Sequence, residues 1–188
     1  PFKLYTKRMA RRWQETFGLS LTRTFNHANI LNFKGDDDLP FRLFNDVQEM
    51  NEIMIQRWNE VVKPGDKVYH LGDVVMGIDP EGWMKKHWPR LMGQKRLIVG
   101  NHDNIKMLSS GGFFAKVEVW RVFAEFGIIM SHIPLNPFSL TRGAEPDKVM
   151  LNVHGHIHEK NIPKGPYRNV CVEQIDYRPI NIEELRVK

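Results

Sequence analysis

Four short polar segments, each beside an apolar strand-like run, constrain this chain more than any other feature. They are Gly72-Asp73, Gly100-Asn101-His102-Asp103, Ser131-His132 and His154-Gly155-His156-Ile157-His158. Glycine lets the backbone turn tightly beside a strand end, and Asp, Asn and His supply the oxygen and nitrogen donors that divalent transition metals accept. The segments therefore predict a metal site assembled from separate parts of the chain.

Helix-like and strand-like segments alternate along the chain. Apolar residues recur at helical spacing between Asn45 and Pro64, and a second helix is predicted to begin at Asp79-Pro80 and to end at Gly93. Strands are expected at 67–71, 96–99, 117–122, 128–131, 149–154 and 169–172. Because several of these strands end in ligand-type residues, we expect the strand ends to meet at one edge and to share one site. This alternation predicts an α/β fold.

The composition fits one folded domain. With 188 residues, of which 41% are hydrophobic and 11% aromatic, the chain is long enough to bury a substantial core, and we expect a single domain over residues 1–188. No apolar run approaches the roughly 20 residues of a membrane-spanning helix. The basic segment 3–12 lacks the apolar stretch of a secretory signal. We therefore expect a cytoplasmic protein with no membrane partner, and the sequence does not indicate an oligomeric state.

The net charge indicates which classes of partner the protein could bind, and the cysteine content indicates whether it could form a disulfide. The formal net charge of +5 favours anionic partners, including phosphate compounds and nucleic acid. Much of the excess lies before residue 24, and Asp36-Asp37-Asp38 opposes it locally, so the support for nucleic acid is weak and a nuclease rests on net charge alone. The single cysteine, Cys171, excludes an intramolecular disulfide, and its apolar neighbours favour a buried structural thiol.

Several histidines beside turns or strand ends favour a shared site, although a lone histidine is most often structural. These are His102, His132, His156 and His158. Asp73 fits a turn after Gly72, but its two oxygens could also bridge two cations and compensate charge that neutral ligands cannot. Asn101 offers a neutral carbonyl oxygen to one ion. His102 could be a ligand or a proton donor to the leaving oxygen of a phosphate ester, with Asp103 orienting it or lying nearby.

Three further residues are candidates for substrate binding. His27 and Asn29 could reach the substrate, and Arg142, in a predicted loop, could contact phosphate, although a solvated cation is its simpler interpretation. His70 and His154 precede the motifs within strands and are expected to pack. No Cys-His or Ser-His-Asp constellation supports nucleophilic catalysis.

The ordered set of motifs resembles the calcineurin-like metallophosphoesterases, especially the short single-domain bacterial and phage members. The resemblance covers about residues 25–182. It implies an α/β sandwich of two mixed β-sheets flanked by helices and two divalent metal ions, often manganese, iron, zinc or nickel. The roles it implies are a ligand bridging both ions (Asp73), ligands of one ion (Asn101, His132 and His156), a ligand of the other (His158) and a residue acting on the leaving group (His102).

The implied activity is hydrolysis of a phosphodiester or phosphomonoester by metal-activated water. Because the sequence contains no evident cap domain and no extended basic face, the expected partner is a small nucleotide-type phosphoester. The alternative is a noncatalytic or one-metal phosphate-binding pseudoenzyme on the same fold.

That alternative comes from a departure at the first motif. Where the family carries Asp-x-His after an apolar strand, this chain has Thr22-Arg23-Thr24, and neither Thr is a comparable ligand. The literal sequence therefore predicts one complete metal position. A second hypothesis is a shifted reading frame. Codons for Ser20 to Thr24 can be read one nucleotide earlier as Ser-Asp-Thr-His, which contains the family motif. With the same shift, codons for Glu15 to Ser20 can be read as the apolar run Asn-Ile-Trp-Phe-Ile, which suits the missing strand. Residues 1–24 are accordingly treated as atypical.

Overall fold

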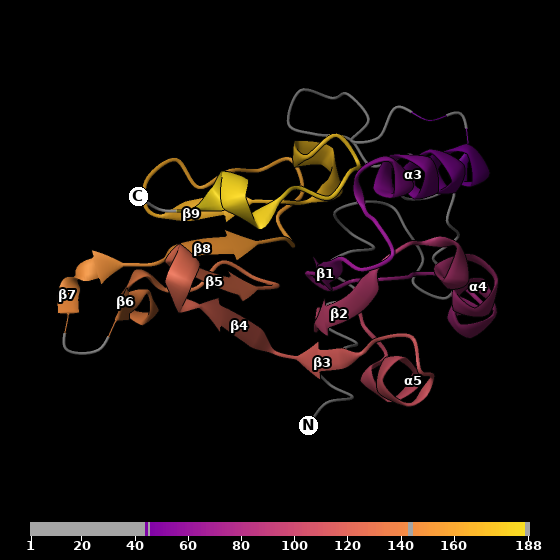
Figure 1. Ribbon diagram of the computed structural model, residues 1–188, viewed down its shortest axis with the longest axis horizontal. Coiled ribbons are helices and arrows are strands. Elements are labelled where there is room, and N and C mark those ends of the chain that lie inside the picture. Colours follow the sequence, from indigo (N-terminus) through magenta and orange to yellow (C-terminus); the bar gives the residue numbers. More distant parts are fainter. Residues whose placement is uncertain (1–43, 45, 143–144, 187–188) are drawn as a thin grey trace, which may run out of the picture.

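Two larger β-sheets lie side by side, with helices beside one of them (Figure 1). This arrangement comes from a computed structural model that describes residue 44 and residues 46–142 and 145–186. It confirms the expected α/β class. None of the helices within these ranges is both long and apolar enough to cross a membrane.

The helices begin where capping side chains precede apolar periodicity. Helix α3 (Val47–Val61) follows Asp46, whose carboxylate accepts a hydrogen bond from the Glu49 amide at 2.8 Å. Helix α4 (Pro80–His87) begins at the predicted Asp79-Pro80 and continues as the 3-10 turn η1 (Trp88–Arg90). The last α-helix is α5 (Ile105–Ser110), and further 3-10 turns are η2 (Ala124–Phe126), η3 (Pro137–Ser139), η4 (Val172–Gln174) and η5 (Ile182–Leu185).

The first sheet is parallel over the described residues and has the order β1-β2-β3. Its strands are β1 (Lys67–His70), β2 (Gln94–Ile98) and β3 (Lys116–Glu118). The second sheet is mixed, with the order β4-β5-β8-β9, and β4 is its antiparallel member. Its strands are β4 (Trp120–Phe123), β5 (Ile128–Ser131), β8 (Leu151–His154) and β9 (Tyr167–Asn169). A small third sheet pairs β6 (Thr141–Arg142) with β7 (Glu145–Val149).

Three of the predicted strands were wrong in extent, and one of them, 149–154, is divided because Val149 ends β7 and β8 begins at Leu151. The single strand expected at 117–122 is divided between the two sheets, and the chain crosses over at Val119, which is 67% exposed. The division has a packing reason, because Val117 contacts the core beside the helices whereas Phe123 contacts the core between the sheets. The strand expected at 169–172 ends at Asn169 and gives way to η4, which leaves Cys171 half-buried.

Alternating side chains of β2 join the layers of the fold. Leu97 packs into the core under the helices with Met84 and Trp88, whereas its neighbour Ile98 packs between the sheets with Met130. Successive side chains of a strand point to opposite faces, so one strand serves both cores. The two sheets are thereby joined by a shared core, and the C-terminal ends of β1, β2, β5 and β8 come to one region.

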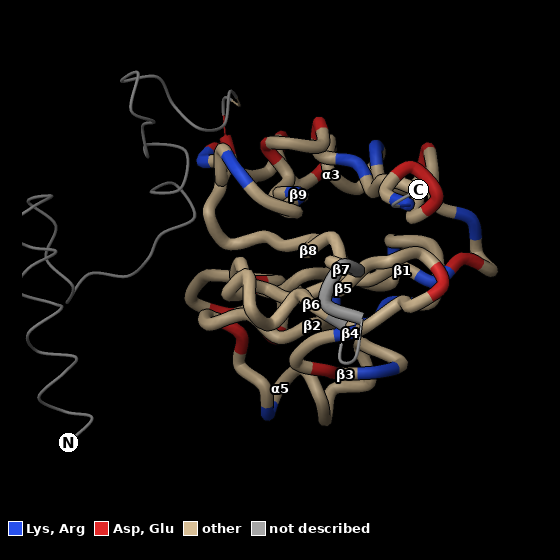
Figure 2. The backbone as a smooth tube through the Cα atoms, turned by 90° about the vertical axis from the view of Figure 1, so that its left-hand side faces the viewer, with Lys and Arg blue, Asp and Glu red and all other residues tan. Residues whose placement is uncertain are grey.

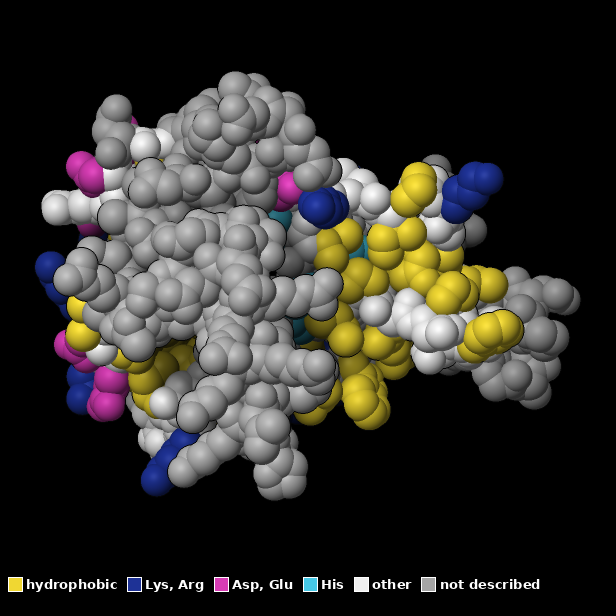
Figure 3. Space-filling view, turned by 180° about the vertical axis from the view of Figure 1, so that it is seen from behind, with side chains coloured by type: hydrophobic (Ala, Val, Ile, Leu, Met, Phe, Trp, Pro, Cys, Tyr) yellow, Lys and Arg dark blue, Asp and Glu magenta, His cyan; other side chains and the backbone are white. Residues whose placement is uncertain are grey.

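The surface is mixed in charge, with one apolar edge. Figure 2 shows Lys and Arg interspersed with Asp and Glu along the described chain, which gives no support to an extended basic face in that view. Figure 3 shows hydrophobic side chains gathered on one side of the molecule. Exposed apolar residues include Trp120 at 61% on the edge strand β4 and Phe138 at 90% in η3.

Candidate metal centre

Gly72 brings the end of β1 against the turn that follows β2. Gly72 has φ +88° and Asp73 has φ +54°, both in the left-handed region. A Cβ on Gly72 would lie 2.5 Å from the Gly100 amide nitrogen and 2.6 Å from His132 Nδ1. Only glycine fits this contact, so the turn is specified by its sequence and delivers the Asp73 carboxylate beside the second sheet.

Replacing Gly72 by Ala should therefore destabilise the fold as well as displace Asp73. The left-handed backbone and the clash with Gly100 together predict a loss of about 2–4 kcal/mol in the free energy of unfolding. Chemical denaturation of the metal-free protein measures it. Gly65→Ala is the matched control, because a Cβ there meets nothing within 4 Å. Equal stabilities of the two variants would contradict the account of this turn.

Asp103 ties the two turns together. Its Oδ2 accepts hydrogen bonds from the backbone amides of Asp73 at 3.0 Å and Gly100 at 2.8 Å, and its Oδ1 accepts one from Val74 at 2.8 Å. A carboxylate engaged by three backbone donors fixes local geometry. Asp103 thus holds Asp73 in position through its carboxylate, and its expected part in orienting His102 stays a prediction.

His102 lies on the same turn with its side chain exposed. Its backbone amide donates to Asp73 Oδ1 at 2.9 Å, so Asp73 is fixed both through its own amide and through its carboxylate. Burial acts to raise the pKa of Asp73, but the neighbouring His132 in its protonated form and the hydrogen bond from the His102 amide outweigh burial and lower that pKa below its ordinary value. Asp73 is consequently an anion near neutral pH.

His132 is the centre of the cluster. Its Nδ1 lies 2.6 Å from the Leu71 carbonyl, an acceptor, so Nδ1 carries the proton and Nε2 carries a lone pair in the neutral ring. Around Nε2 lie three further atoms that could ligate a metal: Asn101 Oδ1 at 2.9 Å, His156 Nδ1 at 3.2 Å and Asp73 Oδ2 at 3.3 Å. The structure thus brings together four of the five predicted metal ligands.

This convergence favours a proton or a cation among the four atoms. An imidazole nitrogen and two oxygens that all present lone pairs repel one another unless a proton or a cation lies among them. One carboxylate, one amide oxygen and two imidazoles are a donor set suited to a first-row divalent ion. Ligand atoms of Asp73, His132 and His156 lie within 4.8 Å of one another, and the Leu71 carbonyl orients the His132 ring as outer-shell acceptors commonly do. These residues fit a metal ion.

The pKa values of the His132 and His156 imidazoles are shifted in opposite directions. Burial acts to lower the pKa of His132, yet Asp73 and the Leu71 carbonyl raise it above its ordinary value. Burial, followed by the neighbouring His132, lowers the pKa of His156, and the charge of His158 adds to this lowering. His132 is therefore the ligand for which protons compete most strongly with a metal.

Metal affinity should fall as the pH falls. Binding requires neutral His132, whose folded-state pKa is raised, so competition begins at higher pH for His132 than for His156 or Asp73, whose pKa values are lowered. Below the pKa of His132, displacement of one proton predicts about a tenfold loss of Mn²⁺ affinity per pH unit. Titration calorimetry between pH 8 and pH 5.5 measures this slope, and a flat profile would exclude His132 as a ligand.

His158 lies beside the cluster without joining it. Its backbone, like that of His156, is left-handed, with φ +51°. Its Nδ1 lies 3.4 Å from Glu173 Oε1, and its side chain is 47% exposed. Glu173 was not predicted as a site residue, because it follows a segment that was expected to be a strand and belongs to no motif.

The other candidates divide into residues of β1, β6 and β8 and residues that the structure does not describe. His154 is fully buried, which confirms that it packs, whereas His70 is half-buried, lines the same cavity as Asp73 and has its ring centroid 6.2 Å from that of Trp88. Arg142 belongs to β6, which Figure 1 shows beside the second sheet at the side away from β1. His27, Asn29 and the segment Thr22-Arg23-Thr24 lie outside the described residues.

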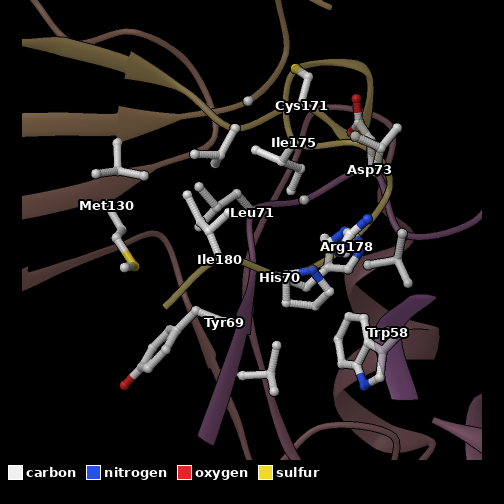
Figure 4. Close-up of a pocket in the computed structure, with 18 of the residues that line it drawn as sticks. Trp58, Tyr69, His70, Leu71, Asp73, Met130, Cys171, Ile175, Arg178 and Ile180 are labelled. Atoms are coloured by element: carbon white, nitrogen blue, oxygen red, sulfur yellow. The ribbon is translucent and has the colours of Figure 1, made fainter. Parts of the chain in front are cut away.

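A large cavity adjoins the cluster (Figure 4). Its volume is about 1700 Å³, and its lining includes Asp73, His132 and His156. Figure 4 shows Asp73 at one side of it and the apolar side chains of Leu71 and Ile180 nearer its middle. The cavity exceeds the 300–1,000 Å³ typical of small-molecule sites, so a small ligand at the donor cluster would occupy only part of it.

Known proteins similar to this chain carry no stated activity. It is 29% identical over 166 residues to "Uncharacterized protein MJ1445" of Methanocaldococcus jannaschii, covering 85% of this chain and 82% of that protein. It is 26% identical over 148 residues to "Gene 66 protein" of Mycobacterium phage L5, covering 64% and 70%. The crystal structure of the protein of unknown function AQ665 from Aquifex aeolicus is similar, with TM-score 0.60, 27% identity and coverage of 86% of this chain and 92% of that chain. No protein-family model matches this chain.

Proposed function

We propose that this protein is a metal-dependent phosphoesterase of the calcineurin-like type that hydrolyses a phosphodiester or phosphomonoester of a small nucleotide-type compound. One observation carries the proposal: Asp73 Oδ2, Asn101 Oδ1 and His156 Nδ1 all lie within 3.3 Å of His132 Nε2, whose other nitrogen donates to a backbone carbonyl. A divalent ion held by these residues would polarise a phosphoryl oxygen and make bound water more acidic.

The protein residues have distinct parts in this proposal. Asp73, Asn101, His132 and His156 hold the ion, and Asp103 keeps Asp73 in place through three backbone amides. His102 is exposed beside the carboxylate, where its imidazole donates a proton to the leaving oxygen of the ester. The cavity beyond Asp73 receives the organic part of the substrate.

Metal content and turnover, measured together, test the proposal. The purified chain, with its mass verified, is analysed for bound metals and assayed for Mn²⁺-dependent hydrolysis of bis-p-nitrophenyl phosphate. Bound metal with turnover that chelation removes and Mn²⁺ restores is the expected result. A chain that binds no divalent ion would overturn the proposal.

A phosphate-binding pseudoenzyme is the second candidate. It is favoured by Thr22 and Thr24 at the first motif, and by the fact that the residues the structure describes form one cluster of three or more His, Cys, Asp or Glu ligands. One bound ion without turnover would select this candidate, whereas two ions with turnover would support the shifted-frame hypothesis for residues 15–24.

A further inference from the structure

A buried carboxylate lies beside the imidazole of His158. Glu173 Oε1 is 3.4 Å from His158 Nδ1, and the Glu173 side chain is 6% exposed whereas that of His158 is 47% exposed. Burying a carboxylate is costly unless it has polar partners, so the pairing stabilises Glu173 as well. Because Nδ1 faces Glu173, the ring nitrogen with which His158 can meet a ligand is Nε2.

The backbone around His158 is held by the same segment that carries Glu173. The side-chain amide of Asn169 donates to the carbonyls of His158 at 2.7 Å and Lys160 at 2.8 Å. The side-chain amide of Gln174 donates to the Glu159 carbonyl at 3.0 Å. These bonds hold a loop in which His158 has a left-handed φ of +51°, a conformation that needs support in a non-glycine residue.

Rotation of the His158 ring is the remaining freedom at this position, and Glu173 restricts it. A carboxylate that accepts the Nδ1–H proton selects one tautomer and one ring orientation, and metal-binding histidines commonly carry such a partner. We propose that Glu173 is a positioning residue that holds His158 as the Nδ1–H tautomer and directs its Nε2 toward a divalent cation beside Asp73. This inference rests on the proposed function.

The test combines Glu173→Leu, which removes the acceptor, with Glu173→Gln, which retains an acceptor oxygen. We expect the affinity of Glu173→Leu for the Mn²⁺ that His158 contacts to fall by about 10–100-fold, and that of Glu173→Gln to fall less. Affinity for the ion held by Asp73, Asn101, His132 and His156 should not change. Glu60→Leu, on the exposed face of α3, is the control and should bind Mn²⁺ like the parent chain. Thermal unfolding of each metal-free variant verifies that it folds.

Two readouts separate positioning from a general structural role. If Glu173 acts through His158, the Glu173→Leu/His158→Ala double variant should bind Mn²⁺ no more weakly than His158→Ala alone. Nitrogen-15 NMR of the metal-free protein at pH 8 should show the Nδ1–H tautomer of His158 in the parent and a tautomer mixture in Glu173→Leu.

The outcomes distinguish this inference from the proposed function. Additive losses of affinity, or an unchanged tautomer in a Glu173→Leu protein that still binds Mn²⁺ normally, would overturn the role of Glu173 and leave the phosphoesterase proposal standing. No Mn²⁺ binding by the parent chain would overturn both the proposed function and the direction of Nε2 toward a cation, even if the tautomer responds to Glu173.

Discussion

Replacing Asp73 by Asn should abolish divalent-metal binding and turnover while leaving the chain folded. Asp73 is the one carboxylate in the cluster of lone pairs around His132, so its loss removes the negative charge that favours a cation. Polarisation by a bound ion is worth several kcal/mol of transition-state stabilisation, so its loss corresponds to about a 10³-fold or larger decrease in kcat/KM.

The metal-free stability of Asp73→Asn should match or exceed that of the parent. An Asn oxygen can still accept from the His102 amide, and its NH₂ group can donate toward His132 Nε2, which relieves the repulsion that a metal ion would otherwise relieve. At Mn²⁺ concentrations 100 times its dissociation constant, the parent should gain about 2.7 kcal/mol of stability, and this gain should vanish in the variant.

Thermal unfolding with and without Mn²⁺, together with the hydrolysis assay, measures both effects of Asp73→Asn. Asp46→Asn is the matched control, because Asn also caps helices well and α3 should be unaffected. If Asp73→Asn retained the Mn²⁺-dependent gain in stability, Asp73 would not be a metal ligand.

The sequence could predict most of the metal cluster because its signals are local. Gly72 has a φ of +88° beside Gly100, so the glycine of the motif marks a real turn requirement. The strand ends at Asp73, Asn101, His132 and His156 were placed by short apolar runs that end in ligand-type residues. Parallel pairing of the strands then brings these ends together, which a pattern of this kind anticipates.

The supporting contacts could not be predicted, because they depend on non-local geometry. The Leu71 carbonyl that orients His132 is 61 residues away in sequence, and the Asp103 contact with Asp73 spans 30 residues. A backbone carbonyl carries no sequence signal, and Glu173 follows a segment that forms a 3-10 turn in place of the expected strand. The division of 117–122 between two sheets likewise depends on which core each apolar residue meets.

Replacing His102 by Ala should lower turnover without weakening metal binding, unlike replacing Asp73, because His102 contacts the cluster through its backbone amide. The His102 amide donates to Asp73 Oδ1, a hydrogen bond that Ala retains, so His102→Ala should bind Mn²⁺ as the parent does. Loss of a positioned proton donor should lower kcat by about 10²–10⁴-fold. The loss should be greater for a phenyl ester than for a nitrophenyl ester, because the poorer leaving group depends more on protonation.

Steady-state kinetics of His102→Ala with both esters, combined with Mn²⁺ titration calorimetry, tests this assignment. His87→Ala is the matched control, since His87 stacks on Trp83 in α4 at a ring separation of 4.8 Å and should leave kcat unchanged. Weaker Mn²⁺ binding by His102→Ala would make His102 a ligand, and equal losses with both esters would remove it as the proton donor. Asp73 and His102 lie on two adjoining turns joined by the hydrogen bond from the His102 amide to Asp73 Oδ1, so this pair of variants would separate metal binding from proton transfer.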